Sequence, residues 1–338
     1  MISTAVLTLS ALMHPVRPVR QSVPNDRLAM ITPAGLRAHV KFLAGDALQG
    51  RGTPSVGLDI AAEYIAARFE AAGLDPLPDG SYFQVHQYQD KSVRNVVGIL
   101  PGRDPKLKAT YVFLTAHYDH LGAQKRPEGN TEDAIYNGAN DNASGTAGVI
   151  ASAEVLGALK GTTKAPKRTI VFMTFWGEER GLLGAREYVK QPLFPVKDTV
   201  GMINLEQIGR TDDSEGPRVG ALSVTGYDFS DLPSMVEATA QKSKVKLEKH
   251  PKFNEPFFNA SDNAAFAAAG IPAHTFCTAF QFADYHQPAD HWDKLNYSNM
   301  AVVTRFIASA TLTLANSDRT PVWNAALPKT ERYRKARG

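Results

Sequence analysis

The chain has 338 residues, of which 43% are hydrophobic, and its formal net charge is +3. This composition supports a sizeable core, and the mild charge without interleaved basic and aromatic motifs argues against a nucleic-acid-binding class. The clearest basic cluster, residues 329–338, is expected to be a solvated tail. Cys277 is the only cysteine, which excludes a disulfide within the chain, and its apolar neighbours predict a buried, unreactive thiol.

The N-terminal residues 1–27 are interpreted as a leader. Its first 13 residues are largely apolar, but no Lys or Arg precedes them and no small-residue cleavage motif follows. We interpret the segment as an atypical export signal, which predicts a periplasmic or extracellular protein. An apolar run of about a dozen residues is too short to span a bilayer, and no later stretch qualifies, so stable membrane insertion is not expected.

After the leader, the apolar spacing predicts two helices, at 36–45 and 57–73, the second ending at Gly73. Strands and helices then alternate. Strands are predicted at 95–102, 110–116, 168–176, 200–206, 219–226 and 271–278, and helices at 142–159, 181–190, 231–243, 261–270 and 298–316.

This alternation predicts an α/β fold with a mixed, mainly parallel central sheet flanked by helices. We expect one domain over residues 28–318 with an N-terminal helical extension, and a basic tail over 319–338. The polar residues 125–136 are expected to form a loop near the functional site.

Three of the predicted strands end in side chains that bind metals. The apolar runs ending at His117, at Glu178–Glu179 and at Glu206 each break off into these polar residues. Ligands of open α/β sheets sit at the carboxyl ends of the strands. Together with Asp141 and His286 from loop-like segments, they give two imidazoles and four carboxylates. That set matches two divalent metals and a general base.

The first two of these positions also have simpler interpretations. His117 and Asp119 form an H-x-D pair in which Asp119 could fix the tautomer of His117, although the pair could be solvated. Asp141 could cap the following helix. A bridging carboxylate would need a close backbone approach, and Gly138 and Gly145 permit that approach.

The remaining positions also have simpler interpretations. Glu178 and Glu179 could be solvated glutamates at a helix start, but the apolar run before them favours a site in which one carboxyl carries protons. Glu206 could lie in a surface turn, but it follows a buried strand, which favours a metal ligand. His286 is preferred to His291 as a ligand, and structural or surface roles are predicted for His120, His250 and His274.

The ordered motifs H-x-D, N-D-N-A-S-G, G-E-E-x-G-L-L-G, N-L-E-x-I-G-R and D-Y-H-x-P-x-D carry a family resemblance. The chain resembles the co-catalytic zinc aminopeptidases, which include bacterial leucine-type enzymes and are related to glutamate carboxypeptidase II and the glutaminyl cyclases. The similarity runs from about Leu36 to Asn316. It implies a zinc-exopeptidase-like fold, two Zn²⁺ ions, peptide substrates and hydrolysis of N-terminal residues by an activated water.

The resemblance also implies roles for individual residues. His117 and Glu206 would bind one zinc, Glu179 and His286 the other, and Asp141 would bridge both. Glu178 would be the general base, and Asp119 would orient His117.

Two positions depart from the pattern of the family. Glu206 stands where the family has Asp, and Asn263 stands where it has His. The longer side chain of Glu206 keeps the charge but moves its oxygens, which puts its coordination in question.

Three other functions remain open at this point. They are a glutaminyl-cyclase-like acyltransferase with one zinc, an inactive receptor-like binding protein, and a carboxypeptidase in which Arg180 or Arg210 would bind the substrate carboxylate.

Overall fold

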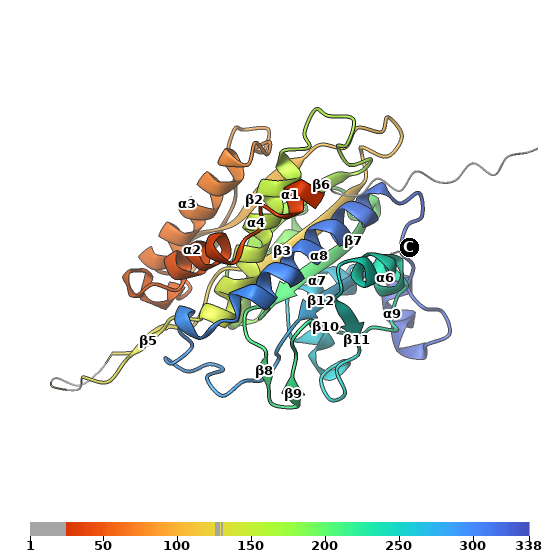
Figure 1. The fold of residues 1–338 in the computed structure, drawn as a ribbon. Helices are drawn as coiled ribbons and strands as arrows, with labels where there is room; N and C mark the ends of the chain where they lie inside the picture. Colours follow the sequence, from red (N-terminus) through yellow and green to blue (C-terminus); the bar gives the residue numbers. More distant parts are fainter. Residues whose placement is uncertain (1–24, 126–128, 130, 338) are drawn as a thin grey trace, which may run out of the picture.

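The computed structural model describes residues 25–125, 129 and 131–337, and its centre is an eight-stranded sheet with helices on both faces (Figure 1). The strand order is β1-β2-β6-β3-β7-β12-β10-β11. The pairs β6–β3, β3–β7, β7–β12 and β10–β11 are parallel, and β1–β2, β2–β6 and β12–β10 are antiparallel. The strands are β1 Phe83–Tyr88, β2 Lys91–Leu100, β3 Tyr111–His117, β6 Thr169–Phe175, β7 Thr199–Glu206, β10 Ala221–Val224, β11 Lys246–Glu248 and β12 Ala273–Cys277. The predicted mixed, mainly parallel sheet is therefore confirmed.

Two short hairpin-like pairs lie outside the main sheet. They are β4 Gly122–Ala123 with β5 Ile135–Tyr136, and β8 Asp212–Asp213 with β9 Gly216–Pro217. Strand β5 forms the end of the polar segment 125–136, whose residues 126–128 and 130 lie outside the described part.

The helices form one layer on each face of the sheet. Helices α2, α3, α4, α6 and α8 cover one face and α5 and α7 the other, with α9 packed on α7 (Figure 1). Their bounds are α1 Asn25–Leu28, α2 Pro33–Leu43, α3 Val56–Ala71, α4 Gly145–Gly157, α5 Leu183–Lys190, α6 Leu232–Lys242, α7 Asn263–Ala268, α8 Tyr297–Asn316 and α9 Glu331–Ala336. Side-chain oxygens of Thr32 and Ser55 cap α2 and α3, as expected where hydroxyl residues precede a helix.

The two cores follow from the alternation of side chains along the strands. In β6, Ile170 and Phe172 point to the layer of α3, α4 and α8, whereas Val171 and Met173 point to the layer of α5 and α7. Strands buried on both faces read as continuous apolar runs, which is why the sequence predicted them well.

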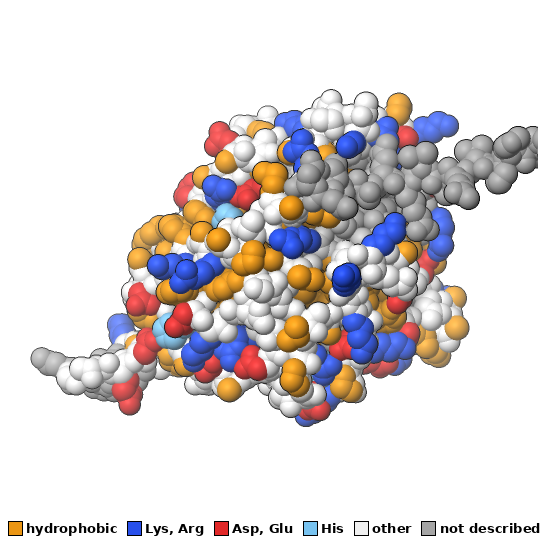
Figure 2. All heavy atoms as spheres, in the orientation of Figure 1, with side chains coloured by type: hydrophobic (Ala, Val, Ile, Leu, Met, Phe, Trp, Pro, Cys, Tyr) orange, Lys and Arg blue, Asp and Glu red, His pale blue; other side chains and the backbone are white. Residues whose placement is uncertain are grey.

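The C-terminal segment differs from its prediction. The solvated tail expected over residues 329–338 was wrong for residues 331–336, because these form α9, whose Tyr333 is buried and packs with Phe258 and Trp323. The basic side chains of α9 point outward while Tyr333 anchors the helix. On the face drawn in Figure 2, basic and acidic side chains are interspersed.

Other predictions have mixed outcomes. Cys277 is buried and free, as predicted. Strands β1 and β11 and helix α9 were not predicted, because they are short and lack a clear apolar period. Residues 1–24, most of the predicted leader, lie outside the described part. Within that part no helix has both the length and the hydropathy to cross a membrane.

Candidate metal centre

Three neighbouring parallel strands deliver the polar side chains of the site to one edge of the sheet. His117 ends β3, Glu206 ends β7, and Glu178 and Glu179 follow β6. Gly177, with φ of +67°, turns the chain from β6 into the short 3-10 helix η3 (Glu178–Arg180). The carboxyl edge predicted from the sequence is therefore where these residues meet.

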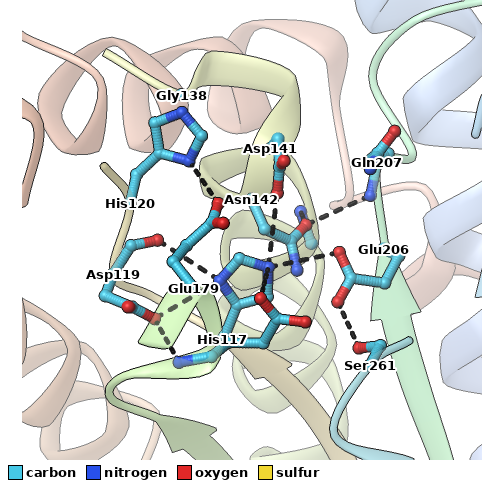
Figure 3. Close-up of polar contacts among 12 residues, drawn as sticks. His117, Asp119, His120, Gly138, Asp141, Asn142, Glu179, Glu206, Gln207 and Ser261 are labelled. Carbon is cyan, nitrogen blue, oxygen red and sulfur yellow. Dashed lines mark hydrogen bonds and ion pairs between the residues drawn. The ribbon is translucent and has the colours of Figure 1, made fainter. Parts of the chain in front are cut away.

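His117 lies at the centre of the first group (Figure 3). Its Nε2 atom is 3.3 Å from Oδ1 of Asp141, 3.3 Å from Oε2 of Glu206 and 3.9 Å from Oε2 of Glu178. The other oxygen of Glu206 accepts a hydrogen bond from Ser261. The longer glutamate thus still presents one oxygen to His117, while Ser261 holds the other.

A second group surrounds the other side of the Asp141 carboxylate. Nε2 of His286 is 3.0 Å from Oδ2 of Asp141 and 3.4 Å from Oε2 of Glu179. Nδ1 of His120 is 2.8 Å from Oε1 of Glu179. Asp141 therefore lies between two imidazole-carboxylate groups, a position suited to a bridging ligand.

The loop that carries Asp141 is fixed by buried polar contacts. Asp290 accepts the backbone N–H groups of Asn140 and Asp141 at 3.0 and 3.1 Å. The Asn142 side chain donates to the carbonyl of Leu205 and accepts from the N–H of Gln207, which ties the loop to the end of β7 (Figure 3). The peptide bond between Asp141 and Asn142 is cis.

Asp119 contacts both His117 and the backbone of Glu178. Nδ1 of His117 is 3.2 Å from the Asp119 carbonyl oxygen and 3.5 Å from its Oδ1 atom. Oδ1 of Asp119 also accepts the N–H of Glu178 at 3.0 Å, and Thr53 donates to Oδ2. Asp119 can therefore orient His117 and fix the start of η3 at the same time.

The two adjacent glutamates differ in electrostatics. Burial, together with the charges of Glu206 and Glu179, raises the pKa of Glu178 well above its usual range, against the attraction of His117. Burial and the charge of Asp141 oppose ionisation of Glu179, yet contacts with His120 and His286 lower its pKa to about 2. Glu178, with its raised pKa, is suited to carry a proton, and Glu179, with its lowered pKa, is suited to remain an anion.

The buried charges of the site are incompletely compensated. Oε1 of Glu179 and Nε2 of His286 make no regular hydrogen bond within the described residues, and neither do the two carboxylate oxygens of Asp262. Buried polar atoms are normally satisfied, so such atoms around one cluster fit a cation. The donor set of imidazole nitrogens and carboxylate oxygens is one that zinc accepts.

The structure brings together all seven site residues expected from the sequence: His117, Asp119, Asp141, Glu178, Glu179, Glu206 and His286. His120, for which a structural or surface role was predicted, is buried and lies against Glu179. Three other histidines considered as candidates lie elsewhere: His274 bonds Ser230, His250 contacts Asp213, and His291 contacts Asp133. Asn263 joins a buried network with Thr275 and the carbonyl of Phe258.

Three supporting residues were missed at the sequence level. Asp290 stands in the same motif as His286, and Ser261 stands two residues before Asn263, so motif position could have suggested both. Arg51 carried no such signal. Its buried guanidinium donates to the carbonyls of Asn137 and Gly138, just before the Asp141 loop, and to those of Tyr118 and Leu43.

A sheet covered by helices on both faces, with a buried imidazole-carboxylate cluster at its carboxyl edge, defines an α/β protein with a candidate metal centre. Residues 95–311 match the family model described as Peptidase family M28, and the chain belongs to this family. The family resemblance drawn from the motifs is therefore confirmed.

Individual relatives agree with this assignment. The chain is 27% identical over 237 residues to a probable leucine aminopeptidase of Trichophyton verrucosum (strain HKI 0517), a match covering 68% of this chain and 59% of that protein. The chain thus spans less than two thirds of the length of this curated relative.

Solved structures share the fold. The LapA aminopeptidase of Legionella pneumophila superposes with a TM-score of 0.67 at 19% identity, covering 87% of this chain and 74% of that chain. BSAP, a zinc aminopeptidase from Bacillus subtilis, superposes with a TM-score of 0.51 at 25% identity, covering 66% and 50%.

Proposed function

We propose that this protein is a zinc-dependent aminopeptidase that removes N-terminal residues from peptides. The observation that carries the proposal is the double cluster around Asp141, with Glu178 beside it as a carboxyl of raised pKa. Membership of a peptidase family and the similarity to a probable leucine aminopeptidase support the same reaction.

We propose the following roles for the site residues. His117 and Glu206 would hold one zinc ion, Glu179 and His286 a second, and Asp141 would bridge both. Bound zinc would supply the Lewis acidity that activates water and polarises the scissile carbonyl. Glu178 would take a proton from the water on its carboxylate and pass it to the leaving amine. Asp119 would hold His117 and the Glu178 backbone in place during this transfer.

The charges around the site favour an amine over a carboxylate as the recognised end of the substrate. Arg210, one of the two candidate carboxylate-binding residues, is already engaged, because its guanidinium pairs with Asp212 and Asp284. Arg180 lies on the exposed side of η3. The surplus of buried carboxylates would instead attract a protonated α-amine.

Substrates with a blocked amino or carboxyl end test which end of the peptide the site recognises. We expect hydrolysis of leucyl-p-nitroanilide and of unblocked dipeptides, and no hydrolysis of the N-acetylated compounds. Cleavage of N-acetylated dipeptides, with loss of activity when their carboxyl end is amidated, would support the carboxypeptidase instead. A wider set of aminoacyl arylamides would then define the preferred residue.

Metal content tests the centre itself. We expect elemental analysis of zinc-reconstituted, dialysed protein to give two zinc ions per chain, and Asp141→Asn to weaken both because its carboxylate faces both groups. One tightly bound ion in the wild-type protein would contradict the two-zinc centre and favour the cyclase-like alternative.

Glu206 offers a second metal test. We expect Glu206→Asp to keep both ions and substantial activity, because the shorter carboxylate is the one usual in the family, even though it gives up Ser261. Glu206→Ala should weaken one ion only, as measured by chelator competition. Full occupancy and unchanged turnover in the alanine variant would show that Glu206 is not a ligand.

A further inference from the structure

His120 is a buried imidazole whose role in the site is not explained by the ligands proposed so far. It follows β3 three residues after His117, and only 1% of its surface is exposed. Its ring points at Glu179 rather than at the solvent (Figure 3), and its Nδ1 atom is 2.8 Å from Oε1 of that residue.

The ring is held in this orientation by its surroundings and lacks regular hydrogen bonds. Neither of its nitrogens makes one within the described residues, and neither does the Glu179 oxygen that Nδ1 faces. The backbone N–H of His120 bonds the carbonyl of Arg51. A Cβ on Gly138 would lie 2.4 Å from the His120 ring, so only glycine at that position lets the ring occupy its place.

We propose that Nδ1 of His120 is a ligand of the metal ion held by Asp141 and Glu179, an inference that rests on the proposed zinc centre. Ligand atoms of His120, Asp141 and Glu179 all lie within 4.8 Å of one another. Two ligands of one zinc ion, each at about 2.0–2.2 Å, lie at most about 4.4 Å apart, so small side-chain shifts suffice.

With His286, this site has four protein ligands, whereas the site of His117, Asp141 and Glu206 has three. Four protein ligands are typical of closed zinc sites, and three of sites that keep a position for water or substrate. The ion beside Glu179 is therefore the more tightly held of the two, and the ion beside Glu206 has the open position. The His286 side chain is 35% exposed and stacks on Tyr285 with ring centroids 4.0 Å apart, whereas His120 is buried.

Cobalt substitution tests the proposal without measuring activity. Zinc is replaced by Co²⁺ in the full-length protein, and paramagnetically shifted, exchangeable imidazole N–H signals are counted by proton NMR. We expect three such signals in the wild-type protein, from His117, His120 and His286, and two in His120→Asn. Two signals in the wild-type protein, with the same two retained in His120→Asn, would overturn the proposal.

Affinity separates a ligand from a residue that merely orients Glu179. Loss of an outer partner of a ligand typically costs about 10–100-fold in metal affinity. We expect His120→Asn to weaken one of the two ions by more than about 100-fold and to spare the other. A smaller loss with an unchanged signal count would show that His120 only positions Glu179, which also overturns the proposal.

The controls separate this inference from the proposed function. His274→Asn replaces a buried histidine bonded to Ser230 and the Thr225 carbonyl, and should leave both affinities unchanged. If the wild-type protein binds two ions but shows two shifted signals, only the role of His120 fails. If it binds no ion, the zinc centre itself fails.

Discussion

Glu178→Gln is expected to reduce turnover by about two to four orders of magnitude, the usual range for loss of a general base, while both zinc ions stay bound. The amide has nearly the shape of the carboxyl but cannot accept the proton of the attacking water. Burial already raises the pKa of Glu178, which marks it as a carboxyl that can carry a proton. Kinetics, zinc analysis and binding of a peptide should be measured on one preparation.

Glu179→Gln is the matched comparison. Glu179 follows the same strand, but it faces His120 and His286 and has a pKa lowered to about 2. This variant should lose affinity for one ion, and excess zinc should restore part of its activity. If Glu178→Gln loses metal while Glu179→Gln keeps it and stops turning over, the two roles are reversed. If neither change alters the rate, the protein is not a hydrolase of this kind.

Arg51→Met is expected to lower the free energy of unfolding by about 3–5 kcal/mol, because several buried carbonyl groups lose their donor and each buried group left unsatisfied costs about 1–3 kcal/mol. Burial lowers the pKa of Arg51 to about 10, so its guanidinium is still charged at neutral pH. Its loss leaves the carbonyls of Tyr118, Leu43, Asn137 and Gly138 without their donor. Because Gly138 precedes the Asp141 loop, zinc affinity should fall as well. Urea denaturation of metal-free and zinc-loaded protein measures both effects.

Two other variants serve as controls for the stability change of Arg51→Met. Arg319→Met removes an exposed guanidinium paired with Asp231 and should change stability by no more than about 1 kcal/mol. Arg51→Lys keeps the positive charge, but its ammonium group cannot donate to all four carbonyls. Its decrease in the free energy of unfolding should therefore lie between those of the other two variants. Equal denaturation midpoints for Arg51→Met and wild type would show that the guanidinium does not stabilise the loop.

The sequence by itself predicted six of the eight strands of the sheet and most of the proposed site. Strands β3, β6 and β7 are buried on both faces, so their apolar runs were visible, and the polar residue after each run marked the sheet edge. His117, Glu178, Glu179 and Glu206 could be proposed from that pattern alone. Asp141 and His286 were added from loop-like segments, and Asp119 from its H-x-D spacing to His117.

Only the tertiary structure decided which further side chains support or join the centre. In the sequence, nothing distinguishes His120 from other histidines near strand ends. Its approach to Glu179 depends on the turn after β3 and on the absence of a side chain at Gly138. Arg51 and Asp290 act through backbone groups distant in sequence, and such contacts leave no periodic signal. Local periodicity reports burial along one element, whereas these contacts arise where separate loops meet, so they become visible only once the chain is folded.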